Sequence, residues 1–149
     1  METSEGFRGE FSFLSNFTLF EKPFKYGELT FDRSEHFYQA MKFDEQWIRE
    51  RVQNHPAKGL KAYVQAMDVY FREDLDEIKE DIMLYILRYK FSKDNPKLRQ
   101  KLIDTEGIEL VEYNSWGDTY WGVCLKTGKG LNRLGNLLMQ VREEILCGF

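Results

Sequence analysis

The sequence predicts a mainly α-helical protein, a compact single-domain helical bundle of about five or six helices with a few short β-strands, over residues 1–149. A length of 149 residues favours one domain and is long enough to bury a substantial core. Residues 74–91 carry apolar side chains at three- and four-residue intervals, which is the period of a helix. Pro56 and the Asp94-Asn95-Pro96 stretch mark places where helices stop and start.

The N-terminal part predicts short elements ahead of the first helix. Residues 1–10 are polar and contain two glycines, so we expect a frayed or loosely packed start. Alternating phenylalanines in residues 11–17 resemble a short strand that ends in a turn. Residues 20–31 predict a hairpin, with its turn at Tyr26-Gly27-Glu28.

The rest of the chain is mostly helical in pattern. The predicted helices cover residues 35–44, 56–67, 74–91, 96–103 and 134–145, and helix-forming residues continue through 47–51. The 74–91 helix, which Asp74 or Asp76 can cap, is apolar over most of its girth, which is typical of a helix at the centre of a small domain. Residues 108–113 predict one short strand.

Residues 34–43, SEHFYQAMKF, carry the candidate chemistry. Ser34 is a good N-cap, and a helix that turns about 100° per residue places Glu35, Gln39 and Lys42 on one polar stripe. Glu35 and Lys42 are then about 10 Å apart along the axis, and both can reach one substrate. The alternative is a solvated surface face. The many aromatic side chains nearby favour the functional interpretation.

Composition narrows the class of protein. A net charge of −4 argues against coating nucleic acid by bulk electrostatics, although it allows a local basic pocket. Two cysteines without metal-ligand spacing indicate a reduced compartment and no metal site. The opening is unlike a signal peptide, and no apolar run approaches the length of a membrane span. We therefore expect a cytoplasmic protein that uses no cofactor and contacts no membrane.

Two loops in the C-terminal part offer further candidates. Residues 114–122 hold two tryptophans, two glycines and Asp118; such rings can stack on a base or sugar, and Asp118 can take or hold a proton. Alternatively, the tryptophans fill the core and Asp118 caps a turn. Residues 126–133 are basic and glycine-rich and lead into a helix, which suits a phosphate cradle but also an ordinary surface loop. Asn16 either closes its turn or reads a ribose or a base.

Four stretches resemble the NADAR family, which is named for its suggested link to NAD and ADP-ribose metabolism. They are residues 13–17, 34–43, 118–122 and 130–139. The similarity extends from about Phe11 to Arg142. It implies a compact, mostly helical domain with small strand additions. Two positions depart from the family pattern: Leu75 stands where a Trp is frequent, and Val123 where an acidic residue or Gly is frequent.

The resemblance also implies N-glycosidase activity. Members cleave the C–N bond of phosphorylated ribosylamino-pyrimidines from early riboflavin synthesis, or remove ADP-ribose from guanine bases in nucleic acid (DNA de-ADP-ribosylation). The expected partner is a small phosphoribosyl or ADP-ribosyl substrate, or ADP-ribosylated nucleic acid. The competing interpretations are a non-catalytic module that binds ADP-ribose or a related nucleotide, and a structural helical adaptor.

The candidate catalytic residues are Glu35, Lys42 and Asp118. Breaking a glycosidic C–N bond builds positive charge on the sugar, so Glu35 can stabilise C1 or activate water, and Asp118 can orient ribose hydroxyls or relay protons. The resemblance places Lys42 for a second route, in which it captures C1 as a Schiff base and needs a lowered pKa. We prefer the Schiff base because Lys42 shares the stripe with Glu35, and direct attack by water stays open.

The predicted substrate-binding residues surround these three. Trp121 or Tyr38 would stack on the base, and the basic loop would hold phosphate. The full set is Asn16, Tyr38, Gln39, Trp121, Gly122, Lys126, Lys129, Asn132 and Arg133.

Overall fold

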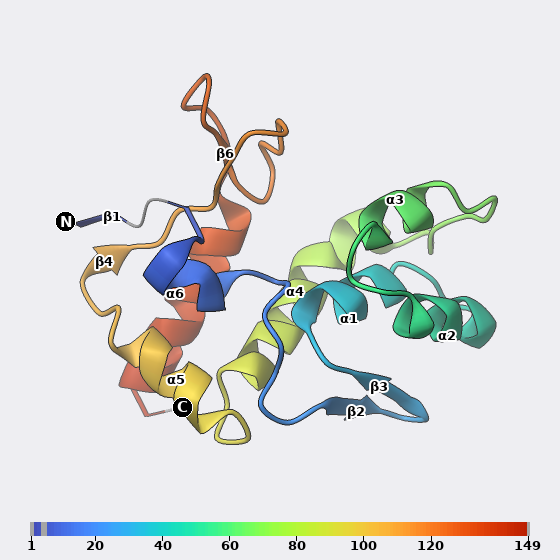
Figure 1. Ribbon diagram of the computed structural model, residues 1–149, viewed down its shortest axis with the longest axis horizontal. Helices are drawn as coiled ribbons and strands as arrows, with labels where there is room; N and C mark the ends of the chain where they lie inside the picture. Colours follow the sequence, from blue (N-terminus) through green and yellow to red (C-terminus); the bar gives the residue numbers. More distant parts are fainter. Residues whose placement is uncertain (1, 4–5, 149) are drawn as a thin grey trace.

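The computed structural model describes residues 2–3 and 6–148, and this part of the chain is mainly helical with short strands, as predicted (Figure 1). It contains six α-helices, one 3-10 helix and three two-stranded sheets. In order, the elements are β1 Glu2–Thr3, η1 Gly9–Leu14, β2 Phe24–Tyr26, β3 Leu29–Phe31, α1 Ser34–Ala40, α2 Gln46–Asn54, α3 Leu60–Gln65, α4 Leu75–Lys90, α5 Pro96–Ile103, β4 Ile108–Glu109, β5 Tyr113–Asn114, β6 Val123–Cys124 and α6 Arg133–Leu146.

The first helix, α1, is short and central. Each of its seven residues is buried, and it packs against α2 and α4, so the polar stripe is not a solvated face. The helix ends at Ala40 rather than near Asp44, because the chain turns there toward α2. The prediction that Ser34 is the N-cap of this helix is wrong. Arg33 is the N-cap residue, and the buried Ser34 hydroxyl has no hydrogen-bond partner among the described residues.

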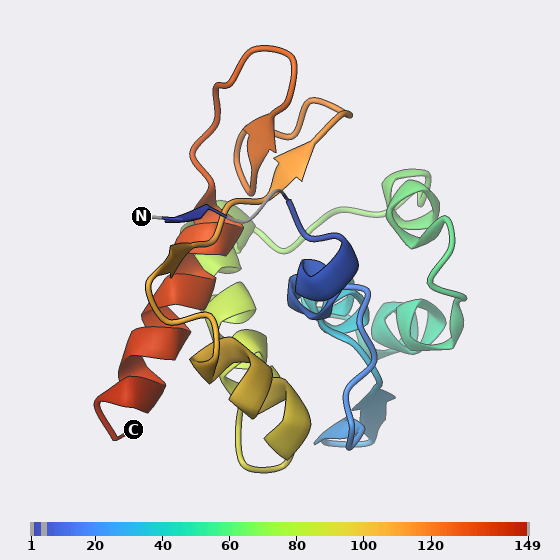
Figure 2. The ribbon, with the colours of Figure 1, turned by 60° about the vertical axis from the view of Figure 1, so that its left-hand side comes forward.

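Helix α4 runs through the middle of the fold between α1 and α6, and Figure 2 shows α6 alongside it. Its burial is one-sided rather than all round, since Met83, Ile86 and Leu87 are buried whereas Tyr85 is 51% exposed. Asp74 is the N-cap residue by position, but its carboxylate binds Arg72 instead of capping the helix.

The predicted strand at residues 11–17 is wrong, because η1 occupies most of this stretch and the turn follows it. The start of the chain is not frayed where it is described, since β1 pairs in parallel with β4; residues 1, 4 and 5 lie outside the described residues. The stretch 108–113 forms parts of two strands, β4 and β5, instead of one.

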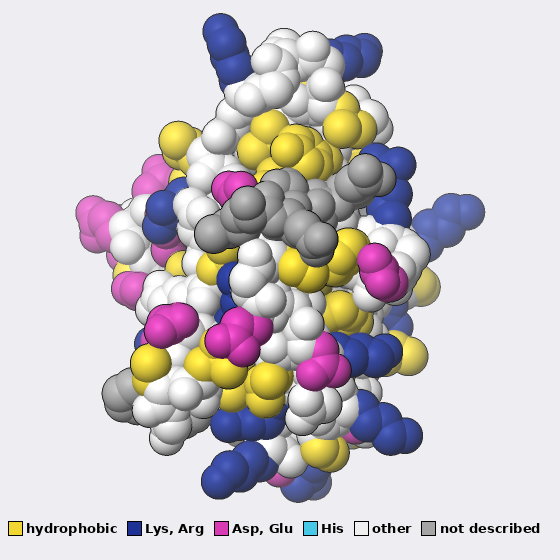
Figure 3. All heavy atoms as spheres, turned by 90° about the vertical axis from the view of Figure 1, so that its left-hand side faces the viewer, with side chains coloured by type: hydrophobic (Ala, Val, Ile, Leu, Met, Phe, Trp, Pro, Cys, Tyr) yellow, Lys and Arg dark blue, Asp and Glu magenta, His cyan; other side chains and the backbone are white. Residues whose placement is uncertain are grey.

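The predicted hairpin is confirmed as β2 and β3, with Gly27 at φ 60° in its turn. The helices predicted at 96–103 and 134–145 are confirmed as α5 and α6. The helix predicted at 56–67 begins only at Leu60, after a left-handed Gly59. Among the described residues, no helix combines the length and the apolar character that crossing a membrane requires. Figure 3 shows acidic and basic side chains interspersed over the described part of one face.

Candidate active site

A cavity of about 620 Å³ gathers side chains from distant parts of the chain. Its lining comes from residues 7–8 before η1 and the turn after it, from α1 and Lys42, from α3 and α4, from residues 112–121 and from the first turn of α6. All three predicted catalytic residues, Glu35, Lys42 and Asp118, line this one cavity. Four of the predicted binding residues also line it: Asn16, Tyr38, Gln39 and Trp121.

Glu35 lies in the first turn of α1 and is 9% exposed. Gln39, one turn later and 2% exposed, donates from Nε2 to Glu35 Oε1 at 2.8 Å. This bond fixes which way the Gln39 amide points, because a carboxylate only accepts hydrogen bonds. It also holds the Glu35 carboxylate in one orientation at the cavity wall.

Lys42 reaches the same cavity from the other end of α1. Its ammonium lies 5.2 Å from the centre of the Tyr38 ring and 5.4 Å from that of Phe71. Burial lowers the pKa of Lys42, as do the charges of Lys61 and Lys79, while Glu35 raises it. The two causes of a lowered lysine pKa, desolvation and cationic neighbours, therefore act here together.

Asp118 is held in a tight turn at the cavity edge. Its Oδ1 accepts the backbone N–H groups of Tyr120 and Trp121, each at 3.0 Å. The Asn114 side chain binds the Asp118 backbone on both sides, at 2.8 and 2.9 Å. Asp118 thus caps a turn, one of the two interpretations that the sequence left open, and it is also one of the residues that line the cavity.

Aromatic rings form much of the remaining wall. Tyr38 and Trp121 meet edge to face with centroids 5.4 Å apart, and burial raises the pKa of the Tyr38 hydroxyl. Trp116 and Phe17 also line the cavity and are largely exposed, at 69% and 51%. Rings that are partly open to solvent can receive a flat ligand.

The other five predicted binding residues lie outside the lining of this cavity. Arg133 binds Glu80, which also accepts the Tyr120 hydroxyl. Lys126 and Lys129 are exposed in the turn after β6. Gly122 and Asn132 are buried.

Asn132 and Gly122 support the backbone of residue 112. Asn132 adopts a left-handed conformation with φ 52°, donates to the Leu110 carbonyl at 2.9 Å and accepts the Glu112 N–H at 2.9 Å. A Cβ atom at Gly122 would collide with the Glu112 carbonyl oxygen. Both residues therefore have a structural role, which is to support the backbone of residues 110–112.

Sequence reasoning missed Glu112, Lys61 and Arg8, which also line the cavity. Burial and the charge of Asp118 raise the pKa of Glu112 to about 7, and Arg8 opposes the shift. Its Oε2 atom is buried without a partner among the described residues. In the sequence, Glu112 is only an acidic residue within a strand-like pattern, and such residues ordinarily lie on the surface.

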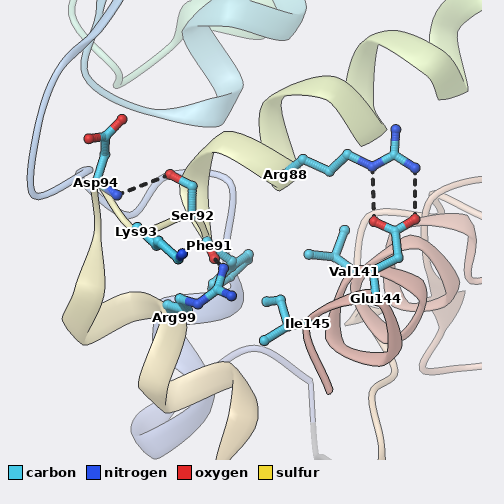
Figure 4. A pocket seen from close by; sticks show the side chains of 9 residues that line it. All are labelled: Arg88, Phe91, Ser92, Lys93, Asp94, Arg99, Val141, Glu144 and Ile145. Carbon is cyan, nitrogen blue, oxygen red and sulfur yellow. Dashed lines mark hydrogen bonds and ion pairs between the residues drawn. The ribbon is translucent and has the colours of Figure 1, made fainter. Parts of the chain in front are cut away.

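A second cavity, of about 720 Å³, lies by the ends of α4 and α6 (Figure 4). None of the predicted site residues lines it. Arg88 and Glu144 pair there through two bonds, at 3.0 and 2.7 Å, and Arg99 donates to the Phe91 carbonyl. Its charged groups are thus largely engaged with one another or with the backbone, and the smaller cavity is the candidate site.

Fold and cavity together define a small, mainly helical domain in which an acid and a primary amine share one aromatic-walled site. A family model described as the NADAR domain matches residues 3–146. The chain belongs to this family.

Related proteins carry names that bear on function. The N-glycosidase YbiA of Escherichia coli is 36% identical over 132 residues, covering 88% of this chain and 79% of that protein. The NMR structure of E. coli YbiA superposes with a TM-score of 0.82 at 32% identity, covering 99% of this chain and 88% of that one. A riboflavin biosynthesis protein of Vibrio vulnificus is 37% identical over 113 residues, which are 75% of this chain and 30% of that protein.

Proposed function

We propose that this protein is an N-glycosidase that hydrolyses the C–N bond between a phosphorylated ribose, or ADP-ribose, and an amino-linked base. The observation that carries the proposal is the placement of Glu35 and Lys42 in one aromatic-walled cavity. The name of the YbiA relatives supports the reaction type, and the riboflavin biosynthesis relative supports a ribosylamino-pyrimidine phosphate as substrate. ADP-ribosylated guanine contains the same kind of bond and is the second candidate.

The mechanism runs through an imine. Protonation of the ring oxygen opens the ribosylamine, and the neutral Lys42 amine adds to C1. A proton moves to the base nitrogen, the C1–N bond breaks, and its electron pair leaves on the base as a free amine. Water then hydrolyses the Schiff base to the aldehyde sugar and restores Lys42. The net change is substrate plus water to sugar plus base.

The surrounding side chains serve these steps. Glu35, next to C1, carries the proton between ring oxygen, base nitrogen and water. Asp118 orients the ribose hydroxyls, and the rings of Tyr38 and Trp121, which line the same cavity, flank the base. Lys61 and Arg8, cations that line the cavity, hold the phosphate.

Borohydride trapping tests the imine route. The protein is mixed with a ribosylamino-pyrimidine phosphate, or with ADP-ribosylated guanine DNA, in the presence of borohydride, and its mass is measured. We expect a sugar adduct on Lys42 that disappears in Lys42→Ala and persists in Lys97→Ala, a matched change at an exposed lysine of α5. Turnover without an adduct would mean direct attack by water.

Calorimetry separates the enzyme from the non-catalytic binding module. Glu35→Gln is expected to bind the ribosylamine with nearly unchanged affinity while turnover falls at least about a hundredfold, the lower bound for loss of a general acid–base. Release of neither base nor sugar from either substrate at high protein concentration would overturn the proposed function.

A further inference from the structure

The amine of Lys42 is in contact with two aromatic rings. Its Nζ atom lies over the face of Tyr38, 5.2 Å from the ring centre, and over the face of Phe71, at 5.4 Å. Among the described residues, this nitrogen forms no hydrogen bond or salt bridge. Tyr38 lines the candidate cavity together with Lys42, whereas Phe71 lies outside its lining. Because a lysine amine is carried on a flexible four-carbon stem, these ring contacts limit where the amine can rest.

Phe71 belongs to the α3–α4 segment, residues 66–74, which is bound to the backbone at Lys42. The N–H of Arg72 donates to the Lys42 carbonyl at 2.8 Å. The Arg72 guanidinium in turn donates to Asp74 at 2.7 Å. The Phe71 ring packs against the buried ring of Phe43, with centroids 5.4 Å apart. Contacts outside the cavity therefore hold the Phe71 ring in place over the amine.

The electrostatic effect of the Phe71 ring alone would oppose the proposed mechanism. A ring face attracts an ammonium and so favours the protonated lysine, whereas attack on C1 needs the neutral amine. The pKa of Lys42 is nevertheless lowered, and burial is the largest cause. What the ring can contribute to the reaction is position, because it restricts the stem that carries the amine. A displacement of about 1 Å can slow a reaction about a hundredfold.

We propose that Phe71 is a positioning residue for Lys42: its ring, held by the α3–α4 segment, fixes the amine in the orientation from which it attacks C1 of the substrate. This inference rests on the proposed function for the role of Lys42 as the nucleophile. Phe71 acts only through Lys42. Its loss should slow attack on a sugar that the cavity orients, and should spare attack on an aldehyde that needs no orientation.

Two aldehydes separate the position of the amine from its accessibility. Amine and aldehyde form an imine and release water, and hydride from cyanoborohydride then reduces the C=N bond. Ribose 5-phosphate carries the C1 aldehyde that the proposed reaction releases, so its addition to Lys42 reverses the final step. Formaldehyde is small enough to react with any accessible neutral amine. Peptide mass spectrometry gives the ratio of the two rates at Lys42, relative to the same ratio at the exposed Lys97.

Phe71→Leu should lower this relative ratio at least about tenfold, because leucine has no flat face to hold the amine. The formaldehyde rate at Lys42 should change by no more than about fivefold, which is the size of an exposed cation–π contact. Phe71→Tyr keeps the ring and should keep the wild-type ratio. Tyr70→Leu is the matched control and should also keep it, because the Tyr70 ring is 93% exposed.

Turnover of a ribosylamino-pyrimidine phosphate gives a second measurement. In Phe71→Leu, kcat should fall at least about tenfold while KM stays within about threefold, because the lost interaction serves the reacting amine and not substrate binding. Phe71→Tyr should restore kcat. Urea unfolding shows which variants are folded. If Phe71→Leu does not fold, Phe71→Met takes its place, since methionine is also apolar and has no ring.

Two results would overturn the positioning role. One is a wild-type ratio no higher at Lys42 than at Lys97. The other is an unchanged ratio in Phe71→Leu, including a parallel fall of both rates, which would make Phe71 only a packing residue. The ratio requires neither a ribosylamine bond nor turnover. Release of neither base nor sugar from either substrate would instead refute the proposed function and would leave this ratio measurable.

Discussion

Glu35 and Lys42 lie at opposite ends of α1 and line the same cavity. Glu35 is in the first turn of the helix, and Lys42 comes two residues after Ala40, the last residue of the helix. The carboxylate raises the pKa of the lysine, while burial and the neighbouring Lys61 lower it further than the carboxylate can restore. In the proposed mechanism, the lowered pKa of Lys42 makes its neutral amine available for attack, and Glu35 moves the protons.

Glu35→Gln should lower the pKa of Lys42 further, because the negative charge that stabilises the protonated amine is gone. Reductive methylation of Lys42 as a function of pH measures this without substrate, with exposed Lys97 in the same digest as the reference. Glu50→Gln, at an exposed position of α2, should leave the profile unchanged. A profile that does not move in Glu35→Gln would show that the two groups are not coupled.

Gly135→Ala in α6 should destabilise the protein. Alanine is preferred over glycine inside a helix by about 1 kcal/mol, so a rise in stability would be the ordinary expectation. Here a Cβ atom would collide with the Leu110 carbonyl oxygen and the Asn132 side chain, which brace the cavity wall. We expect a net loss of about 1–3 kcal/mol in urea unfolding. Glu143→Ala, exposed on the same helix, should change stability by less than about 0.5 kcal/mol, and a more stable Gly135→Ala would contradict the packing argument.

Long periodic segments and the β2–β3 hairpin were predictable from the sequence, and the other short segments were predicted less well. The apolar spacing in residues 134–145 is enough to specify α6. The end of α1 is different: the Lys42 carbonyl accepts the N–H of Arg72, a partner that no local pattern can indicate. Similarly, two phenylalanines alternating in η1 are too few to distinguish a strand from a 3-10 helix.

The same distinction applies to the candidate site. The spacing of Glu35, Gln39 and Lys42 needed only a helical period, so the sequence could place them together. Glu112 became a candidate only through its burial, which depends on Asn132 at the start of α6 and on the pairing of β5 with β6. Such contacts join segments that are separated in the chain, so the local spacing of apolar residues does not predict them.

Phosphate binding should depend on Lys61 more than on the loop after β6. Lys61 lines the cavity, whereas Lys126 and Lys129 lie outside its lining. We expect Lys61→Gln to weaken ribose 5-phosphate binding about tenfold and to leave ribose binding unchanged, as measured by calorimetry. The double variant of Lys126→Gln with Lys129→Gln is the matched control. If it alone weakens binding, the glycine-rich loop holds the phosphate, as the sequence suggested.

Lys90 should make the stability of the fold rise with pH. The side chain is fully buried, donates to the Ser15 carbonyl at 2.8 Å and thereby anchors the turn that carries Asn16 into the cavity. Burial lowers its pKa to about 7, from 10.5 in a solvated lysine. Between these values the unfolded chain binds more protons than the folded one, so the free energy of unfolding increases with pH by up to about 1.4 kcal/mol per unit.

Lys90→Met removes this titration. Urea unfolding between pH 7.5 and 9.5 should show a smaller rise in stability for the variant than for wild type. Lys97→Met, at an exposed position of α5, should retain the wild-type slope. The range stops short of pH 10 because burial raises the pKa values of Tyr38 and Tyr89, whose ionisation then opposes folding. Equal slopes in Lys90→Met and wild type would mean that Lys90 keeps its proton in the folded protein, and that the bond to Ser15 is made by the charged amine throughout.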